Sequence, residues 1–227
     1  MMDQLEKGDK TFYTWFRKSY APLIMVVIFL YLLFSFLAPI AMKVGLPTIG
    51  KFIYRSYSNV CHQYIYRSLF LFGEQPFYPV SPTNELLTYQ EEFGITVGDE
   101  KAARNIIGNS HAGYKVAICQ RDIAIYGALL IFAIFFWISK RRIRKIPFWV
   151  WVLLAVVPIG VDGFWQFFSS IESNFFVNLE HESTPVLRFI TGGMFGYFTG
   201  WYLLPAIEDS YQDEEKGLLI SVKNNEA

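Results

Sequence analysis

Four apolar stretches, each long enough for one crossing of a lipid bilayer, constrain the fold of this chain more than any other feature. A helix needs about 20 mostly apolar residues to span a hydrocarbon core of about 30 Å. Four segments fit this requirement: 22–43, 119–139, 147–168 and 186–205. The sequence therefore predicts an all-α membrane protein with four transmembrane helices and with the lipid bilayer as its main environment.

The placement of lysine and arginine predicts the orientation of these helices, because cytoplasmic loops are enriched in both residues. Residues 1–21 carry four such cations, and the turn 140–146 carries five. With four crossings both segments lie on one side, which we expect to be cytoplasmic. The loop 169–185 has no lysine or arginine and is expected outside, together with the long segment 44–118. The chain is thus predicted to be a multi-pass protein of the cell membrane, with both termini, including the tail 206–227, in the cytoplasm.

The outer segment 44–118 divides into two parts of different character. At about residues 51–73, polar side chains recur at helical spacing, with Arg55 and His62 on one face. This pattern is typical of an amphipathic helix in the membrane interface, or of a re-entrant element packed against the spans. Residues 74–116 contain several prolines and glycines and an acidic stretch, which predict a soluble loop.

Both cysteines of the chain fall on the predicted outer side, next to residue types that bind metals. Cys61 is followed by His62, and Cys119 stands three residues before Asp122, so the latter two side chains share one face of a helix. Zinc accepts Cys, His and Asp ligands, so one interpretation is a zinc site built from these four residues. A second is a disulfide between the two cysteines, which an oxidising compartment would favour. A third is two unrelated buried thiols that behave as small apolar groups.

A single acid within the third predicted span, Asp162, is the second chemical signal. An ionisable residue in the membrane is costly and by default indicates function, which makes Asp162 a candidate catalytic residue. Gln166 lies one helical turn further, and Arg188 at the outer end of the fourth span is the expected cationic partner. The alternative is a structural Asp–Arg pair that fixes one helix against another. Other polar residues expected to support the site are Gln63, Arg67, Arg121 and Tyr126.

The fourth predicted span contains three glycines at four-residue intervals, Gly192, Gly196 and Gly200. Small residues at this spacing let two helices approach closely. Packing within the chain is the favoured use. The alternative is a homodimer through segment 186–205, or contact with another membrane protein.

Several short motifs follow one another along the chain. They are Cys61-His62-Gln63 with Arg67-Ser68, then Cys119-Gln120-Arg121 with Tyr126-Gly127, then Asp162-Gly163 with Gln166, and finally Arg188 with Gly192. This combination resembles a family of bacterial and archaeal membrane proteins that is catalogued only as a domain of unknown function. The resemblance runs from about Tyr54 to Leu204; each motif is short, and their combination is specific.

The chain departs from the pattern of that family at the start of the second span. The family has a second cysteine in Cys-x-Arg-Cys where this chain has Asp122, and a glycine where it has Ala124. Loss of that cysteine removes a thiol pair but keeps a zinc ligand, so the resemblance favours a metal site of Cys61, His62, Cys119 and Asp122. The family carries no agreed activity, so the resemblance implies a fold and a site and no reaction.

These observations favour a membrane metalloprotein whose zinc ion is structural rather than catalytic, because no second acid or base with clear geometry accompanies the site. The alternative is a subunit or assembly partner of a larger membrane complex with a Cys61–Cys119 disulfide. A thiol-redox protein resembling the four-helix quinone-linked oxidases is disfavoured, because the chain has no Cys-x-x-Cys pair. A net charge of zero without a basic stripe argues against nucleic-acid binding.

Overall fold

The computed structural model describes the backbone of residues 2–81, 86–96, 99–170 and 183–225, and the side chains of 15–81, 86–96, 99–164 and 183–213. The chain is mostly helical, as predicted, and it also contains a small sheet. Its elements are α1 (Met2–Lys43), α2 (Pro47–Tyr57), a 3-10 turn (Ile65–Arg67), β1 (Ser68–Leu71), α3 (Tyr89–Phe93), α4 (Glu100–Asn105), β2 (Gly108–Asn109), β3 (Gly113–Cys119), α5 (Gln120–Ile138), α6 (Phe148–Trp151), a π-helical turn (Val152–Val156), α7 (Val157–Ser170) and α8 (Pro185–Asn225).

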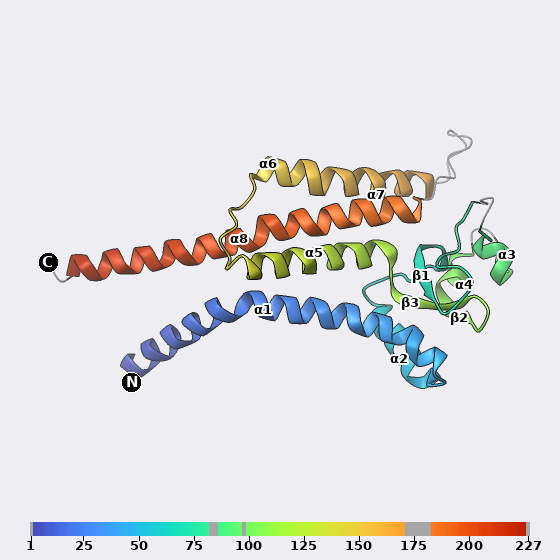
Figure 1. Cartoon of the computed structure of the whole chain (residues 1–227), viewed down its shortest axis with the longest axis horizontal. Coiled ribbons are helices and arrows are strands. Elements are labelled where there is room, and N and C mark those ends of the chain that lie inside the picture. The colour runs from blue at the N-terminus through green and yellow to red at the C-terminus, as the bar shows by residue number, and fades with distance from the viewer. Residues whose placement is uncertain (1, 82–85, 97–98, 171–182, 226–227) are drawn as a thin grey trace.

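The long helices run side by side along the longest axis of the molecule (Figure 1). The strands and the short helices α2, α3 and α4 gather at one end of this helical layer, and both chain termini lie at the other end. We call these two ends the sheet end and the terminal end. The sheet and the two termini therefore lie at opposite ends of the helical layer.

Two helical segments are long and apolar enough to cross a membrane, Trp15–Lys43 of α1 and Gln120–Ile138 of α5. Only 22% and 17% of their most apolar windows are buried within the chain, so most of these apolar side chains face outward, unlike those of a core helix. The segments predicted as the third and fourth spans are helical too, in α6–α7 and in α8. A shorter apolar helix covers Phe148–Phe164, and among the described residues only α1 and α5 combine the length and the apolarity of a span.

The predicted glycine ridge lies against α5 of the same chain. A Cβ atom added at Gly196 would stand 2.0 Å from the carbonyl oxygen of Ile125, and one added at Gly192 would stand 2.8 Å from that of Arg121. At Gly200 the nearest atoms belong to Leu129 and to Phe132 on the next turns of α5. The absence of side chains at these positions therefore lets α8 pack directly on the backbone of α5.

The sheet has three antiparallel strands in the order β1-β3-β2. Phe70 of β1 pairs with Lys115 of β3, and Ser68 pairs with Cys119 after a bulge. Buried aromatic side chains cover the sheet, with the ring of Phe70 edge-on to Tyr78 at 5.0 Å between centroids. This small domain has its own apolar core, which explains how it folds beyond the helical layer.

The sheet corrects two predictions for the segment 44–118. The predicted amphipathic helix 51–73 is instead helix α2, which begins at Pro47 and ends at Tyr57, followed by a turn and strand β1. The predicted soluble loop 74–116 contains α3, α4, β2 and most of β3. Helical spacing of polar residues cannot reveal β1, because that strand is stabilised by pairing with β3 more than 40 residues away.

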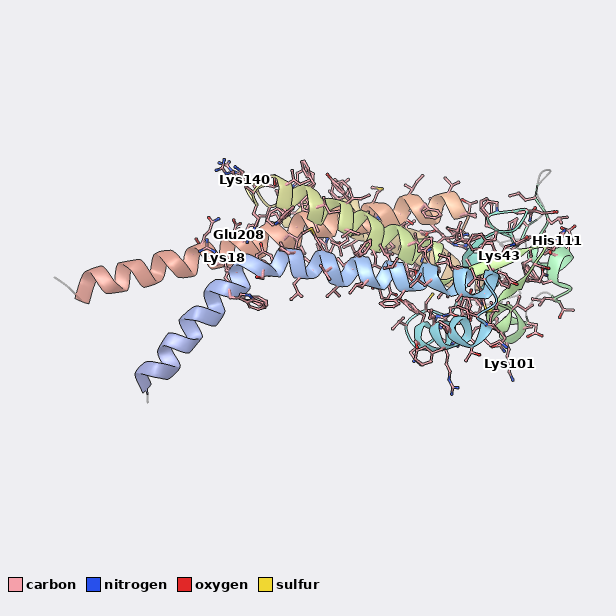
Figure 2. All side chains as sticks on the ribbon, turned by 60° about the horizontal axis from the view of Figure 1, so that its bottom comes forward. Lys18, Lys43, Lys101, His111, Lys140 and Glu208 are labelled. Carbon is pink, nitrogen blue, oxygen red and sulfur yellow. The ribbon has the colours of Figure 1, made fainter. Side chains whose placement is uncertain are left out.

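At the terminal end, Arg141 ties the turn after α5 to α1 and α8. Its guanidinium donates hydrogen bonds to the carbonyl oxygens of Arg17 at 2.6 Å and of Lys18 at 3.0 Å. It also lies 3.5 Å from Glu208 of α8, which accepts a hydrogen bond from the Tyr20 hydroxyl. Figure 2 shows Lys18, Lys140 and Glu208 together at this end.

Candidate functional site

Cys61 is held at the end of the turn that follows α2. Its backbone N–H donates to the carbonyl of Tyr57 at 2.9 Å, which continues the last turn of the helix. Two residues later Gln63 adopts a left-handed backbone conformation with φ of 56°, which is uncommon for a residue with a side chain. The reversal turns the chain away from α2, so Cys61 is buried while the next residue, His62, is exposed.

Cys119 stands where strand β3 changes into helix α5. It occupies the N-cap position, and its Sγ accepts a hydrogen bond from the backbone N–H of Asp122 at 3.4 Å. This cap brings the side chains of Cys119 and Asp122 to one side of the first helical turn, as their three-residue spacing predicts.

The fold brings Cys61, Cys119 and Asp122 together. The two Sγ atoms and a carboxylate oxygen all lie within 4.8 Å of one another, and we call this group the thiol–carboxylate cluster. Apolar side chains pack around the cysteines from α1 and α5, including Leu32, Phe36 and Ile123. Both cysteines are free thiols in this structure.

His62 does not belong to the group of close ligand atoms. Its ring is exposed and stacks on the ring of Tyr64 at 5.6 Å between centroids. Adjacent residues in the turn point to opposite sides, so burial of Cys61 carries the neighbouring imidazole outward. The structure thus unites three of the four residues from which the sequence predicts a metal site.

The two thiols are electrostatically linked. A hydrogen bond with the Cys119 thiol lowers the pKa of Cys61 below its ordinary value, against the opposing effects of burial and of the Asp122 carboxylate. Because the thiolate is the form that binds metals, this arrangement favours Cys61 as the more readily deprotonated ligand.

A second polar network joins α5, α7 and α8. The Arg121 guanidinium forms an ion pair with Asp162, whose side chain also accepts a hydrogen bond from the Thr191 hydroxyl at 3.2 Å. Asp162 is only 5% exposed, and these two groups are its partners among the described residues. The prediction that Arg188 pairs with Asp162 is therefore wrong. The ion pair is formed by Arg121, which faces α7 from the first turn of α5.

Arg188 belongs to a third network, which links α8 to the sheet. Its guanidinium donates to the carbonyl of Tyr66 at 3.0 Å and to the side-chain oxygen of Gln120 at 3.4 Å. Gln120 in turn donates to the carbonyl of Ser68 at 3.0 Å. Gln120 stands within the motif Cys119-Gln120-Arg121, but nothing in the sequence placed it among the predicted site residues.

The remaining predicted residues lie around these networks. The Gln63 side chain donates to the carbonyl of Tyr54 at 2.9 Å, and the guanidinium of Arg67 lies over the ring of Tyr66 at 5.4 Å. The Tyr126 ring packs on Tyr31 of α1 at 4.7 Å between centroids. Gln166 belongs to α7, and its side chain lies outside the described part of the chain.

Four consecutive residues at the start of α5 thus serve three different networks. Cys119 and Asp122 face Cys61, Gln120 faces the sheet and α8, and Arg121 faces α7. Successive residues of a helix are rotated by about 100°, so a single turn distributes its side chains around the whole bundle. The first turn of α5 is consequently the junction at which the sheet meets the long helices.

Comparison with known proteins agrees with a membrane protein whose activity is not established. Residues 102–202 match a family described as "Predicted membrane protein (DUF2085)". An uncharacterised protein of Methanocaldococcus jannaschii is 27% identical over 194 residues, which cover 83% of this chain and 92% of that protein. No solved structure matches the chain. The chain is therefore similar to a family of predicted membrane proteins and to a distant archaeal relative, and neither name states an activity.

Proposed function

We propose that the chain is a multi-pass protein of the cell membrane, crossing it with α1, α5, α6–α7 and the first half of α8. The outward-facing apolar helices support this topology, as does the position of both termini at one end (Figure 1). The basic turn with Lys140 and Arg141 lies at the same terminal end, which indicates the cytoplasmic side. The sheet end then lies on the side of the membrane opposite the cytoplasm.

Labelling of two introduced cysteines in intact cells tests this orientation. Lys101→Cys lies on α4 at the sheet end, and Lys140→Cys lies in the turn at the terminal end; both lysines are exposed (Figure 2). A membrane-impermeant maleimide should label the first variant in intact cells and the second only after lysis. The unmodified chain gives the background of its two native cysteines, and the opposite labelling pattern would reverse the proposed orientation.

The thiol–carboxylate cluster binds one zinc ion, and its proposed role is structural. The observation that carries the proposal is the approach of three ligand atoms to within 4.8 Å of one another. Around tetrahedral zinc, with bonds of about 2.3 Å to sulfur, neighbouring ligand atoms lie about 3.8 Å apart. The cluster needs only a small contraction to reach this geometry, and a water molecule can supply a fourth ligand.

A metal at this position would connect the turn after α2 to the junction of β3 and α5. Those segments meet in the cluster, because Cys61 ends the turn while Cys119 caps the helix. Apolar side chains from α1 and α5 surround the cysteines, and this favours a closed structural site over one open to a substrate. Metal binding would accordingly stabilise the attachment of the sheet end to the long helices.

Metal content of the purified full-length protein tests the proposal. About one zinc per chain is expected, and Cys119→Ser or Asp122→Ala should reduce it well below that value, because each removes a ligand. His62→Ala is the matched control, since its imidazole is exposed and outside the cluster. If His62→Ala lost its zinc while Asp122→Ala kept it, the ligand assignment would be overturned.

The closeness of the two sulfur atoms also supports a second candidate, a Cys61–Cys119 disulfide that fixes the same junction. Thiol labelling distinguishes the zinc site from the disulfide. Metal ligands become reactive after chelation without a reductant, whereas disulfide sulfurs become reactive only after reduction. A role as a subunit or assembly partner of a larger membrane complex is compatible with either form of the junction.

A further inference from the structure

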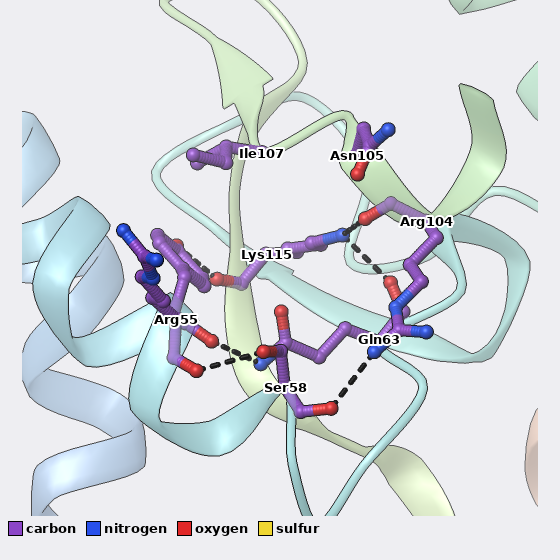
Figure 3. A pocket seen from close by; sticks show the side chains of 8 residues that line it. Arg55, Ser58, Gln63, Arg104, Asn105, Ile107 and Lys115 are labelled. Carbon is purple, nitrogen blue, oxygen red and sulfur yellow. Dashed lines mark hydrogen bonds between the residues drawn. The ribbon is translucent and has the colours of Figure 1, made fainter. Parts of the chain in front are cut away.

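A pocket of about 230 Å³ opens at the sheet end, between α2, the turn after it, α4 and β3. Figure 3 shows its walls, to which Tyr54, Arg55, Ser58, Gln63, Arg104 and Lys115 contribute. None of the three residues of the thiol–carboxylate cluster lines this pocket. The pocket therefore requires its own explanation.

The lining carries a concentration of positive charge. Arg55, Arg104 and Lys115 all line the pocket, and none of its eight lining residues is acidic. Within the described residues none of these three cations forms an ion pair. Glu100, one turn before Arg104 on α4, instead accepts a hydrogen bond from Tyr64 at 3.1 Å and is not a lining residue. Three cations with no carboxylate partner among the described residues favour an anionic ligand.

Lys115 is the most informative of the three, because its side chain is only 1% exposed. Its Nζ donates to the carbonyl of Gln63 at 2.6 Å and to the carbonyl of Arg104 at 2.7 Å. An ammonium group has three N–H donors, so one remains for a ligand in the pocket. Burial lowers the pKa of Lys115 to about 7, against the opposing effect of the nearby Cys61 thiolate.

The arginines complete the arrangement from the two sides of the pocket. Arg104 donates one N–H to the carbonyl of Ser58 at 2.8 Å, which holds its guanidinium over the turn after α2. A guanidinium has five N–H donors, so Arg104 retains several for a second acceptor. Arg55 projects from α2 with an exposed side chain and contributes positive charge at the rim.

Neutral side chains hold the walls in place and leave ligand binding to the cations. The Tyr54 hydroxyl donates to the carbonyl of Lys115, the Gln63 amide donates to the carbonyl of Tyr54, and the Ser58 hydroxyl donates to the carbonyl of Arg55 (Figure 3). These bonds fix β3 against α2 before any ligand enters. A preorganised site of this kind loses little conformational entropy on binding.

We propose that this pocket binds a phosphate group, held by Lys115 inside and by the exposed Arg104 and Arg55 at the rim. Phosphate offers several acceptor oxygens and a charge that matches this set of donors, and arginine recognises it in a bidentate manner. Helix α2, which carries Arg55, also carries two exposed apolar residues, Ile49 at 52% and Phe52 at 71% exposure. Phe52 lies one turn before Arg55, so the headgroup of a phospholipid and a soluble phosphate are both sources of the required chemistry.

Binding of two probes to the full-length protein tests the proposal. Inorganic phosphate is titrated into the detergent-solubilised protein while its unfolding temperature is followed. In parallel, native mass spectrometry compares retention of phosphatidylglycerol with that of a galactosyl diacylglycerol, which lacks phosphate. Arg104→Gln and Arg55→Gln should each weaken binding by about tenfold. Lys101→Gln on the exposed face of α4 is the matched control and should bind as the unmodified chain does.

Phosphate binding that Arg104→Gln weakens supports a soluble ligand, and selective retention of phosphatidylglycerol that the same variant abolishes supports a lipid headgroup. Absence of binding by both probes would overturn the proposal, as would equal losses in Arg104→Gln and Lys101→Gln. Zinc content measured on the same samples should not change. The phosphate site can therefore fail while the proposed metal cluster stands, and the reverse also holds.

Discussion

Arg121 on α5 forms an ion pair with Asp162 on α7, and a hydrogen bond from Thr191 on α8 completes the environment of the carboxylate. One buried acid thus links three of the long helices. In the chain, its partner Arg121 directly precedes Asp122, which belongs to the thiol–carboxylate cluster. The buried acid that the sequence singles out as a candidate catalytic residue has an arrangement that is also sufficient for a structural role.

Replacement of Asp162 by Asn should leave membrane insertion intact and lower the stability of the folded protein. Removal of the carboxylate leaves the Arg121 guanidinium without its counter-charge, and breaking a buried pair from one side costs about 3 kcal/mol. Unfolding in detergent, followed by tryptophan fluorescence, measures the change. Asp209→Asn is the control, because its pair with Lys145 is exposed and worth at most about 1 kcal/mol. Equal effects of the two variants would show that the buried pair does not hold the helices together.

Gly196→Ala should destabilise the packing of α8 on α5. The added Cβ would stand 2.0 Å from the Ile125 carbonyl oxygen, so the helices must separate, at a cost of about 1 to 3 kcal/mol. Gly193→Ala on the same helix has no atom within 4 Å of the new Cβ. That control should be neutral or stabilising by up to about 1 kcal/mol, because alanine is the better helix former. The unfolding temperature should therefore fall in Gly196→Ala alone, and an equal fall in Gly193→Ala would place the helix contact elsewhere.

The pairing of His111 with two acids should make the sheet end more stable in mildly acidic solution. A hydrogen bond to Glu92, supported by the charge of Glu74, raises the pKa of His111 above its ordinary value. The group binds its proton more tightly when folded, so its contribution is fully present below the unfolded-state pKa of about 6.5 and is lost as the pH rises through the folded-state pKa.

The difference in unfolding temperature between the unmodified chain and His111→Gln should accordingly be larger at about pH 5.5 than at about pH 8.5. The effect is small, because the imidazole is exposed and the pair is screened by solvent. A difference that does not change with pH would show that protonation of His111 plays no part.

Arg141→Ala should loosen the terminal end of the bundle. The guanidinium donates to the carbonyls of Arg17 and Lys18 and lies beside Glu208, so its removal costs several hydrogen bonds between α1, α8 and the turn after α5. A loss of about 1 to 3 kcal/mol in unfolding free energy is expected. The adjacent Arg142 is exposed, and Arg142→Ala should change stability by no more than about 0.5 kcal/mol. Proteolysis of the turn offers a second measurement, with faster cleavage expected in the first variant alone.

Residue patterns within one helix were readable from the sequence, and contacts between elements were not. The apolar runs at 119–139 and 186–205 coincide closely with α5 and with the first half of α8, because hydrophobicity is a local property. The i, i+3 spacing of Cys119 and Asp122 likewise placed both side chains on one face. By contrast, β1 depends on a partner strand that is distant in the chain, and no residue pattern within 51–73 predicts this strand.

The choice of partners failed for a related reason. Arg188 is near Asp162 in the predicted topology, but which side of a helix faces which neighbour is decided by packing, and the glycines of α8 set that rotation. His62 was selected for its adjacency to Cys61, and the turn after α2 points the two side chains in opposite directions. Lys115 and Gln120 were missed because a lone polar residue in an apolar stretch shows its role only when its distant partners are known.

The metal proposal is tested most directly by zinc K-edge X-ray absorption of the purified protein in detergent. The cluster of Cys61, Cys119 and Asp122 predicts two sulfur ligands at about 2.3 Å and light-atom ligands at about 2.0 to 2.1 Å, the latter from the carboxylate and a water molecule. Cys61→Ser should remove one sulfur from this shell. A protein that holds no zinc with both thiols open to alkylation, or a zinc shell without sulfur, would contradict the assignment.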